Sequence, residues 1–81
     1  MIDRAALIIA VSNPRNWSDG TKPLYSICDA GQGVAVEARN ISGMIHARAT
    51  FGNFVALGKP LKSRSDAARS AINAVLLSAG Y

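Results

Sequence analysis

The sequence predicts a small α+β domain in which an antiparallel sheet of three to four strands packs one face against a single C-terminal helix. Three observations support this fold class. Apolar residues near the C-terminus recur at helical spacing. Upstream segments alternate between apolar and polar residues, which is the period of a half-buried strand. Glycine-containing turns separate these segments, so the strands are expected to be joined as hairpins.

The C-terminal segment carries the start, face and end signals of an amphipathic helix. Ser63 and Asp66 form an S-x-x-D capping box, and Asp66 also places negative charge at the positive end of the helix dipole. Gly80 suits the left-handed position after a helix, and Tyr81 is then expected to fold back on Leu76. The stripe is rich in alanine, which lets the helix lie close to the sheet. It consists of Ala68, Ala71, Ile72, Val75, Leu76 and Ala79.

The first part of the chain is interpreted as a strand and a loop. Residues 5–11 are aliphatic and β-branched, and Pro14 follows them, so we expect a strand buried on both faces. A helix in this segment is the alternative, although Pro14 would stop it early. Residues 12–23 are rich in Pro and Asn and are expected to form a long loop.

A first hairpin is expected in the middle of the chain. Residues 24–29 pair with residues 33–39 through a Gly-X turn at 31–32. This register sets Ile27 opposite Val36 and Tyr25 opposite Ala38, on the face that the helix covers.

A second hairpin is expected to turn at residues 40–43 and to set Glu37 opposite His46. Phe54–Leu57 either extends its last strand or forms a separate short one. An antiparallel sheet can leave one face in water. The outer face of this sheet is expected to carry Glu37, Arg39, His46, Arg48 and Thr50.

Composition indicates a single domain over residues 1–81. The hydrophobic content of 49% predicts a folded chain, and the net charge of +4 is compatible with a polyanionic partner without requiring one. Cys28 is the only cysteine, which excludes an intramolecular disulfide. Residues 5–11 are too short to span a bilayer, and Asp3 with Arg4 makes a poor signal-peptide start. We therefore expect a cytoplasmic protein with no membrane partner.

Enzymatic chemistry is not expected. One Cys and one His at unrelated positions do not make a metal site, and no nucleotide-binding loop is present. A buried structural role is expected for Cys28. We therefore predict no catalytic residue, no cofactor and no metal. The carboxylates are scattered over loops, turns and a cap, at Asp3, Asp19, Asp29, Glu37 and Asp66.

Two groups of residues are candidates for binding a protein partner. The first is Trp17 with Arg15, because Trp and Arg are enriched at binding hot spots. A loop Trp can also stack a nucleobase, and the alternative is that Trp17 folds back to cover the sheet edge. The second group is Arg39, His46 and Arg48 on the outer sheet face. Here the alternative is a cross-strand pair of Glu37 with His46 or Arg48.

Basic residues also surround the start of the C-terminal helix. Free N–H groups and the helix dipole favour phosphate there, so a site for a phosphodiester backbone is one interpretation. The alternative is a solvated helix start, and Asp66 already occupies part of the anion site. The candidate phosphate-binding residues are Lys59, Lys62, Arg64 and Arg69.

Residues 24–77 resemble the β-β-β-α part of a double-stranded RNA-binding domain. The likeness is strongest at residues 63–71, SRSDAARSA, which look like the basic, alanine-rich start of that family's last helix. The resemblance implies phosphate contacts across a groove of duplex RNA. Only Arg64 occupies a matching basic position, whereas Ser65 and Ala68 stand where the family usually has lysine. The family's first helix would precede the sheet, where residues 1–11 instead predict a strand.

In size and style the chain also resembles small phage-encoded inhibitors of host machinery, including anti-CRISPR proteins. The first functional hypothesis is a non-enzymatic protein that acts through protein–protein interaction, because the basic charge is too sparse for a strong nucleic-acid hypothesis, and a phage-type inhibitor is one form of it. The second is a nucleic-acid-binding domain that uses the basic helix start. The third is a structural homodimer that forms through an edge strand.

Overall fold

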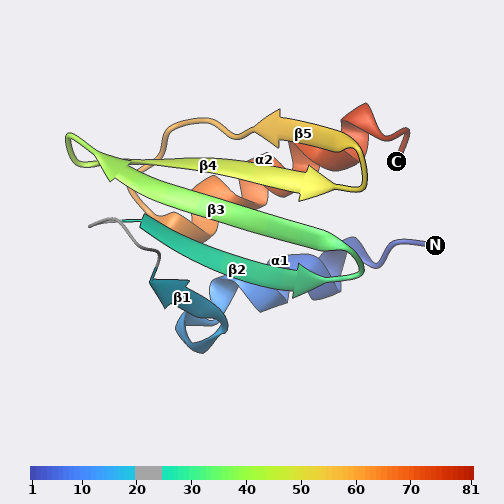
Figure 1. Ribbon diagram of the computed structural model, residues 1–81, viewed down its shortest axis with the longest axis horizontal. Coiled ribbons are helices and arrows are strands. Elements are labelled where there is room, and N and C mark those ends of the chain that lie inside the picture. Colours follow the sequence, from blue (N-terminus) through green and yellow to red (C-terminus); the bar gives the residue numbers. More distant parts are fainter. Residues whose placement is uncertain (20–24) are drawn as a thin grey trace.

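The computed structural model describes residues 1–19 and 25–81, which form a two-layer fold with a five-stranded antiparallel sheet in front and helices behind it (Figure 1). The strands lie in the order β1-β2-β3-β4-β5, so neighbours in sequence are neighbours in the sheet. The predicted α+β class with a C-terminal helix is confirmed, whereas the expected three to four strands are five. The elements are α1 (Arg4–Ser12), the 3-10 helix η1 (Pro14–Asn16), β1 (Trp17–Asp19), β2 (Tyr25–Gly31), β3 (Val34–Ile41), β4 (Met44–Phe51), β5 (Phe54–Leu57) and α2 (Arg64–Ser78).

Helix α2 begins and ends as its sequence predicts. The Ser63 hydroxyl accepts a hydrogen bond from the backbone N–H of Asp66 at 3.4 Å. At the other end, Tyr81 donates its backbone N–H to Leu76 at 2.9 Å, and Gly80 adopts a φ of 90°. These are features of a Schellman ending. The Tyr81 ring packs edge-on against Phe51, with ring centroids 5.9 Å apart, and this contact anchors the C-terminus to the sheet.

Small residues bring α2 and the sheet close together. Ala67 and Ala71 on the helix are fully buried, and Ala47 and Ala49 of β4 belong to the same core cluster. Just beyond β5, a Cβ built on Gly58 would lie 2.7 Å from both the Ala67 carbonyl oxygen and the Ala71 nitrogen. The backbone at Gly58 therefore lies directly against the helix. The buried alanines of the two layers are Ala30, Ala38, Ala47, Ala49, Ala67, Ala68 and Ala71.

The strand expected over residues 5–11 is wrong, because this segment forms α1. Asp3 caps the helix by accepting a hydrogen bond from the Ala6 N–H at 3.1 Å. The Gln32 side chain, from the turn between β2 and β3, exchanges two more hydrogen bonds with the Asp3 backbone, at 2.7 and 2.9 Å. Leu7 and Val11 lie one helical turn apart and are buried in the core. Nine residues fit before Pro14, so this proline ends the helix without preventing it.

The long loop expected over residues 12–23 is also partly wrong. It contains η1 and β1, and Trp17 in β1 pairs with Cys28 in β2. The remainder of that predicted loop and the first residue of the predicted strand 24–29 lie outside the described residues. The extra strand explains why the sheet is wider than the sequence predicts.

The register expected for the first hairpin is off by one residue. The turn lies at Gln32 and Gly33, whose φ values of 55° and 80° suit a two-residue hairpin turn. A bulge at Ala30 then shifts the pairing, so that Ile27 lies opposite Glu37 instead of Val36. Because side chains alternate along a strand, a shift of one residue moves a side chain to the other face of the sheet. Tyr25 and Ile27 are therefore on the outer face.

The second hairpin keeps the predicted faces with a different pairing. Its two-residue turn at Ser42 and Gly43 sets Glu37 opposite Arg48 and Arg39 opposite His46. The expected pairing of Glu37 with His46 is thus wrong by two residues, and a shift of two leaves every side chain on its predicted face. Of the two alternatives left open for Phe54–Leu57, the structure shows the separate strand, β5.

The close approach at Gly58 predicts a large effect of a single methyl group. We expect Gly58→Ala to lower the free energy of unfolding by about 3 kcal/mol, because two backbone atoms of α2 must move to admit the Cβ. Gly43→Ala is the comparison, since nothing lies within 4 Å of its Cβ and only its positive φ is strained. That variant should lose about 1 kcal/mol. Urea denaturation measures both, and equal losses would contradict the proposed contact.

Candidate functional site

The candidate site is the face of the sheet that the helices leave open, which is toward the viewer in Figure 1. Both helices pack on the opposite face, where they share one core with the inward side chains of the sheet. The register arranges the outward side chains in rows across the open face, and two of these rows form the site. The first row runs Ile27, Glu37, Arg48, Leu57, and the second runs Tyr25, Arg39, His46.

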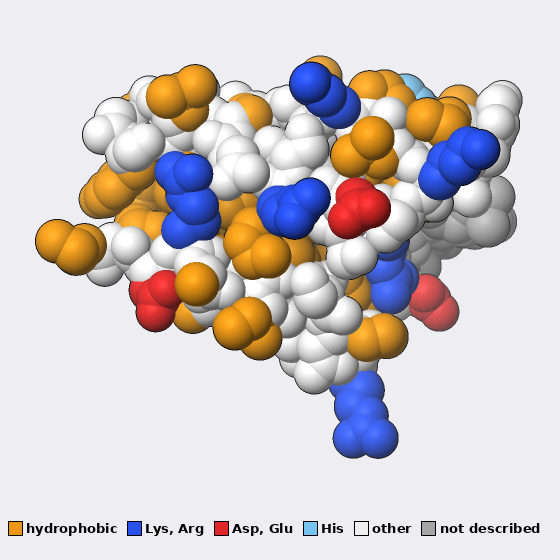
Figure 2. Space-filling model, turned by 180° about the vertical axis from the view of Figure 1, so that it is seen from behind, with side chains coloured by type: hydrophobic (Ala, Val, Ile, Leu, Met, Phe, Trp, Pro, Cys, Tyr) orange, Lys and Arg blue, Asp and Glu red, His pale blue; other side chains and the backbone are white. Residues whose placement is uncertain are grey.

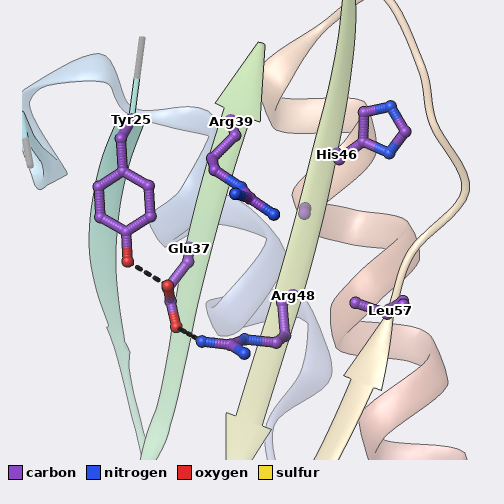
Figure 3. A pocket seen from close by; sticks show the side chains of 7 residues that line it. Tyr25, Glu37, Arg39, His46, Arg48 and Leu57 are labelled. Atoms are coloured by element: carbon purple, nitrogen blue, oxygen red, sulfur yellow. Dashed lines mark hydrogen bonds and ion pairs between the residues drawn. The ribbon is translucent and has the colours of Figure 1, made fainter. Parts of the chain in front are cut away.

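A hollow of about 410 Å³ lies over these two rows (Figure 3). Strands β2 to β5 each contribute to it, so its walls come from four consecutive strands. A rigid sheet therefore positions every side chain of the hollow. The lining residues are Tyr25, Glu37, Arg39, His46, Ala47, Arg48 and Leu57.

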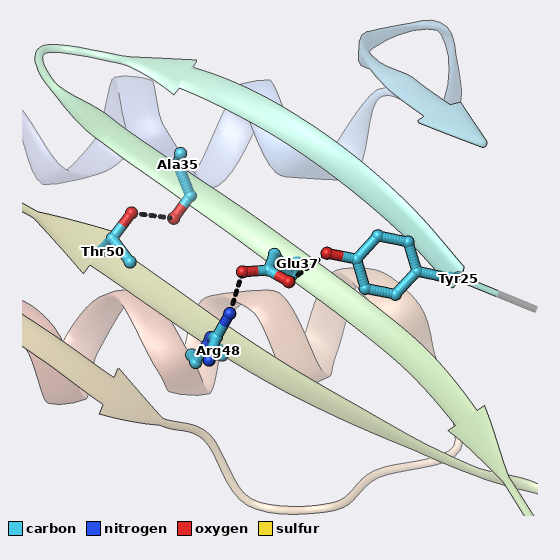
Figure 4. Close-up of polar contacts among 5 residues, drawn as sticks. All are labelled: Tyr25, Ala35, Glu37, Arg48 and Thr50. Atoms are coloured by element: carbon cyan, nitrogen blue, oxygen red, sulfur yellow. Dashed lines mark hydrogen bonds and ion pairs between the residues drawn. The ribbon is translucent and has the colours of Figure 1, made fainter. Parts of the chain in front are cut away.

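Glu37 is the centre of a three-residue contact in this hollow. Arg48 donates from Nη2 to one carboxylate oxygen of Glu37, and the Tyr25 hydroxyl donates to the other (Figures 3 and 4). These two hydrogen bonds lower the pKa of Glu37, with that of Arg48 the larger cause. The hydrogen bond to Glu37 is also the main cause that raises the pKa of Tyr25. Glu37 thus stays charged, holds the tyrosine proton in place and neutralises one of the two arginines. Of the two expected alternatives, the pair with Arg48 is the one formed.

Arg39 supplies the positive charge that remains. No hydrogen bond or ion pair links its guanidinium to another side chain within residues 1–19 and 25–81. Figure 3 shows this group extending from β3 over the sheet toward β4. His46, its cross-strand neighbour, is also exposed and turns its ring away from Glu37. Arg39 is therefore the group best placed to meet an anionic side chain in this hollow.

A second, shallower hollow of about 340 Å³ adjoins the first. Tyr25 and Arg39 line both, and Asp19 and Arg64 lie at its far side. The two hollows together extend the candidate surface from β5 to the start of α2.

Trp17 lies elsewhere, at the edge of the sheet on the side of the helices. Its indole N–H donates to the Val11 carbonyl at 2.9 Å, and the Arg64 guanidinium lies 4.6 Å from the ring centroid. The ring is half-buried and packs against the core. These contacts are the ones expected if Trp17 covers the sheet edge. Arg15 is exposed in η1, so the structure does not bring this pair together with Arg39, His46 and Arg48.

The basic residues near the start of α2 do not gather into one patch. Lys59, Lys62 and Arg69 are exposed, whereas Arg64 is held over Trp17. Figure 2, which shows the side opposite to Figure 1, has Lys and Arg side chains spread over the surface with acidic side chains between them. Asp66 is itself exposed within the first turn of α2. The four candidate phosphate-binding residues therefore present a dispersed charge.

Three functional candidates were missed from the sequence. Tyr25 and Ile27 were assigned to the covered face because the bulge at Ala30 was not recognised. Leu57 was not assigned to either face of the sheet, because Phe54–Leu57 was expected either to extend the preceding strand or to form a separate one. The glycines on both sides of Gln32 were the available signal, since they allow a tight turn at either of two positions.

Cys28 is buried, as expected, and burial raises the pKa of its thiol. In the described part of the chain, no three His, Cys, Asp or Glu side chains cluster as metal ligands would. None of the helices in residues 1–19 and 25–81 has the length and apolar character needed to cross a membrane.

Comparisons with known proteins do not add a relative to this picture: no family model, curated protein or solved structure matches the chain.

The contact around Glu37 predicts a pH-dependent contribution to stability. Because its pKa is lowered in the folded chain, the contact stabilises the fold above about pH 4.3, the usual glutamate value, and this contribution is lost as the pH falls through the folded pKa. We expect Glu37→Gln to lower the free energy of unfolding by about 1 kcal/mol at neutral pH. The difference from the unmodified chain should shrink as the pH falls below that range.

Urea denaturation over a series of pH values checks this prediction. Asp19→Asn is the control, since Asp19 is exposed and forms no ion pair with any described residue. A loss for Glu37→Gln that stays the same at every pH would show that the charge of Glu37 is not what stabilises the contact.

Proposed function

We propose that the chain is a protein-binding module that uses the open face of the sheet. The observation that carries this proposal is the combination, on one uncovered face, of exposed aliphatic side chains with an arginine that lacks a partner in the described chain. Ile27 is 42% exposed, Val55 58% and Leu57 73%, and all three point outward. Apolar side chains grouped around polar anchors are typical of interaction surfaces.

The arrangement of the first row supports a specific mode of contact. Ile27 and Leu57 stand at its ends, and the Glu37–Arg48 pair lies between them. A partner can bury the two aliphatic ends without separating the ion pair, because that pair is already satisfied within the sheet. Separating or burying an unpaired charge would weaken binding. The row therefore offers apolar contact at low electrostatic cost.

Arg39 defines the charge of the partner. Its guanidinium offers donors in a planar arrangement that suits a carboxylate. Tyr25 beside it supplies an aromatic surface of the kind enriched at interface centres. The partner surface that fits is an acidic side chain flanked by apolar ones.

The charge balance of this face favours protein over nucleic acid. Arg39 and Arg48 are its basic residues, and Glu37 and Asp29 are acidic residues on the same side of the sheet. A surface that binds the phosphate backbone requires a basic surplus. The surplus of this chain lies instead near α2, at Lys59, Lys62 and Arg69, and binding of duplex RNA there is the competing outcome of the experiment below.

The likeness in size and style to phage-encoded inhibitors suggests that the module acts as an inhibitor. In that case, occupation of the open face blocks a surface that the bound protein needs for its own activity.

Charge reversal at Arg39 tests the proposal. We expect Arg39→Glu to reduce capture of the partner from a nuclease-treated lysate about tenfold or more, since it opposes an acidic group at the centre of the interface. Arg69→Glu makes the same change on exposed α2 and is the matched control, expected to capture normally. Loss of capture only with Arg69→Glu, or only after nuclease treatment, would instead support nucleic acid.

Photo-crosslinking locates the contact independently. A photoreactive residue at Ile27 should form an adduct with the captured protein, and one at Leu77 should not. Leu77 is the matched position because it is 74% exposed and apolar but lies on α2. Adducts from Leu77 alone would place the interface on the helices and contradict the proposal.

A further inference from the structure

Strand β5 forms one edge of the sheet, and the hydrogen bonds of its backbone are only half used. It pairs with β4 on one side, with Phe54 opposite Phe51 and Ala56 opposite Ala49. Antiparallel pairs alternate between residues that exchange hydrogen bonds and residues that do not. The two-residue turn between β4 and β5 makes Phe54 and Phe51 a pair that exchanges hydrogen bonds. The hydrogen bond from the Gly58 N–H to the Ala47 carbonyl, at 2.9 Å, continues this alternation along the strand.

This alternation directs the N–H and C=O groups of Val55 and Leu57 away from β4. The turn, loop and side-chain hydrogen bonds of the described residues involve neither of them. The side chains of both residues are exposed, at 58% and 73%. An uncharged edge of this kind is a template for pairing with another strand, and proteins usually protect such edges with charge or proline. Within Phe54–Leu57 neither is present.

We propose that β5 pairs antiparallel with β5 of a second copy of this chain, about a two-fold axis at Ala56. In this register Val55 lies opposite Leu57 of the partner subunit, and the reverse pair completes the symmetry. Both residues have outward backbone groups, so each of these pairs forms two hydrogen bonds. The register is self-complementary because the two outward residues are equally spaced on either side of Ala56.

The side chains also suit a second copy. Val55 and Leu57 both point to the open face, so each packs against the other kind across the interface. Ala56 points to the helix side, where its small side chain leaves room for Ala56 of the partner subunit. In the same register Lys59 comes near Asn53 of the partner subunit. No like charges are opposed, which satisfies the electrostatic requirement of a symmetric pair.

The length of the edge sets the strength and the size of the assembly. Four residues bury less than the roughly 800 Å² per partner of a standard interface, so we expect a weak, concentration-dependent dimer in the micromolar range or above. Lys59 and Pro60 lie two and three residues beyond the end of β5 and stop the pairing from extending. The opposite edge, β1, has three residues and carries Asp19. The assembly therefore closes at two copies, with both open faces on the same side of one continuous sheet.

Sedimentation velocity over micromolar to millimolar concentrations tests this inference. We expect the unmodified chain to shift from monomer to dimer. Val55→Pro should weaken dimerisation about tenfold or more, because it removes one intermolecular hydrogen bond from each copy. It leaves the ladder to β4 intact, since the N–H of Val55 points outward, and proline is tolerated at such edge positions. A single monomeric species throughout this concentration range would overturn the proposal.

A charge substitution separates the edge from the open face as a whole. Leu57→Lys should also weaken the dimer, whereas Ile27→Lys makes a comparable change on the same face in β2 and should not. Dimers that persist in Leu57→Lys and dissociate in Ile27→Lys would move the interface away from β5. Circular dichroism of each variant verifies that the fold is retained.

Disulfide trapping tests the register itself. Ala56→Cys places two thiols opposite each other on the two-fold axis, at a non-bonded pair whose Cα atoms are about 4.5 Å apart. We expect it to form a cross-linked dimer on mild oxidation. Val55→Cys is the control, because it lies opposite Leu57 of the partner subunit, so the two introduced thiols do not face each other. Efficient cross-linking of Val55→Cys without that of Ala56→Cys would exclude this register. The buried Cys28 is expected not to interfere.

Discussion

The close packing of α2 on the sheet is the constraint on which the rest of the structure depends. Ala67 and Ala71 on the helix share one core with Ala47 and Ala49 of β4, and the backbone at Gly58 lies directly against the helix. Because interiors are packed without voids, this short separation determines how α1 fits beside α2, with Leu7 and Val11 completing the core. The same packing buries the inward apolar side chains of the sheet on the face that the helices cover. The other face is left open, and its side chains are free to serve binding.

Charge pairing within the sheet governs the electrostatics of the open face. Glu37 receives hydrogen bonds from Arg48 and Tyr25, so the central charges are satisfied within the sheet. Arg39 remains as a directed cation beside exposed aliphatic side chains. The β5 edge adds a second surface, which shares Val55 and Leu57 with the open face and whose unpaired backbone groups suit a strand of the same sequence. If both surfaces act as proposed, a dimer presents two open faces side by side, and weak contacts at each can combine.

Part of the candidate site could be predicted from the sequence. Alternation along β3 and β4 placed Arg39, His46 and Arg48 on one outer face, and the structure brings them together there. A register error of two residues did not matter, because side chains repeat every two residues. Tyr25 could not be placed, since the bulge at Ala30 is a single-residue event that inverts the whole of β2. For Trp17 the sequence left open whether it binds a partner or covers the sheet edge, and its contacts with Val11, six residues away, and with the distant Arg64 hold it at that edge.

The fold divides in the same way between local and distant causes. Helix α2 follows from its own residues, because capping by Ser63 and the left-handed turn at Gly80 are decided within a few positions along the chain. Residues 5–11 follow a local cap at Asp3, yet a short aliphatic run suits a buried strand or a buried helix equally. The Asp3 backbone is also bonded to Gln32, and these two residues meet only when the first hairpin has formed. Local signals were therefore sufficient to predict α2. To predict α1, and the face of the sheet on which each β2 side chain lies, contacts that exist only in the folded chain were also needed.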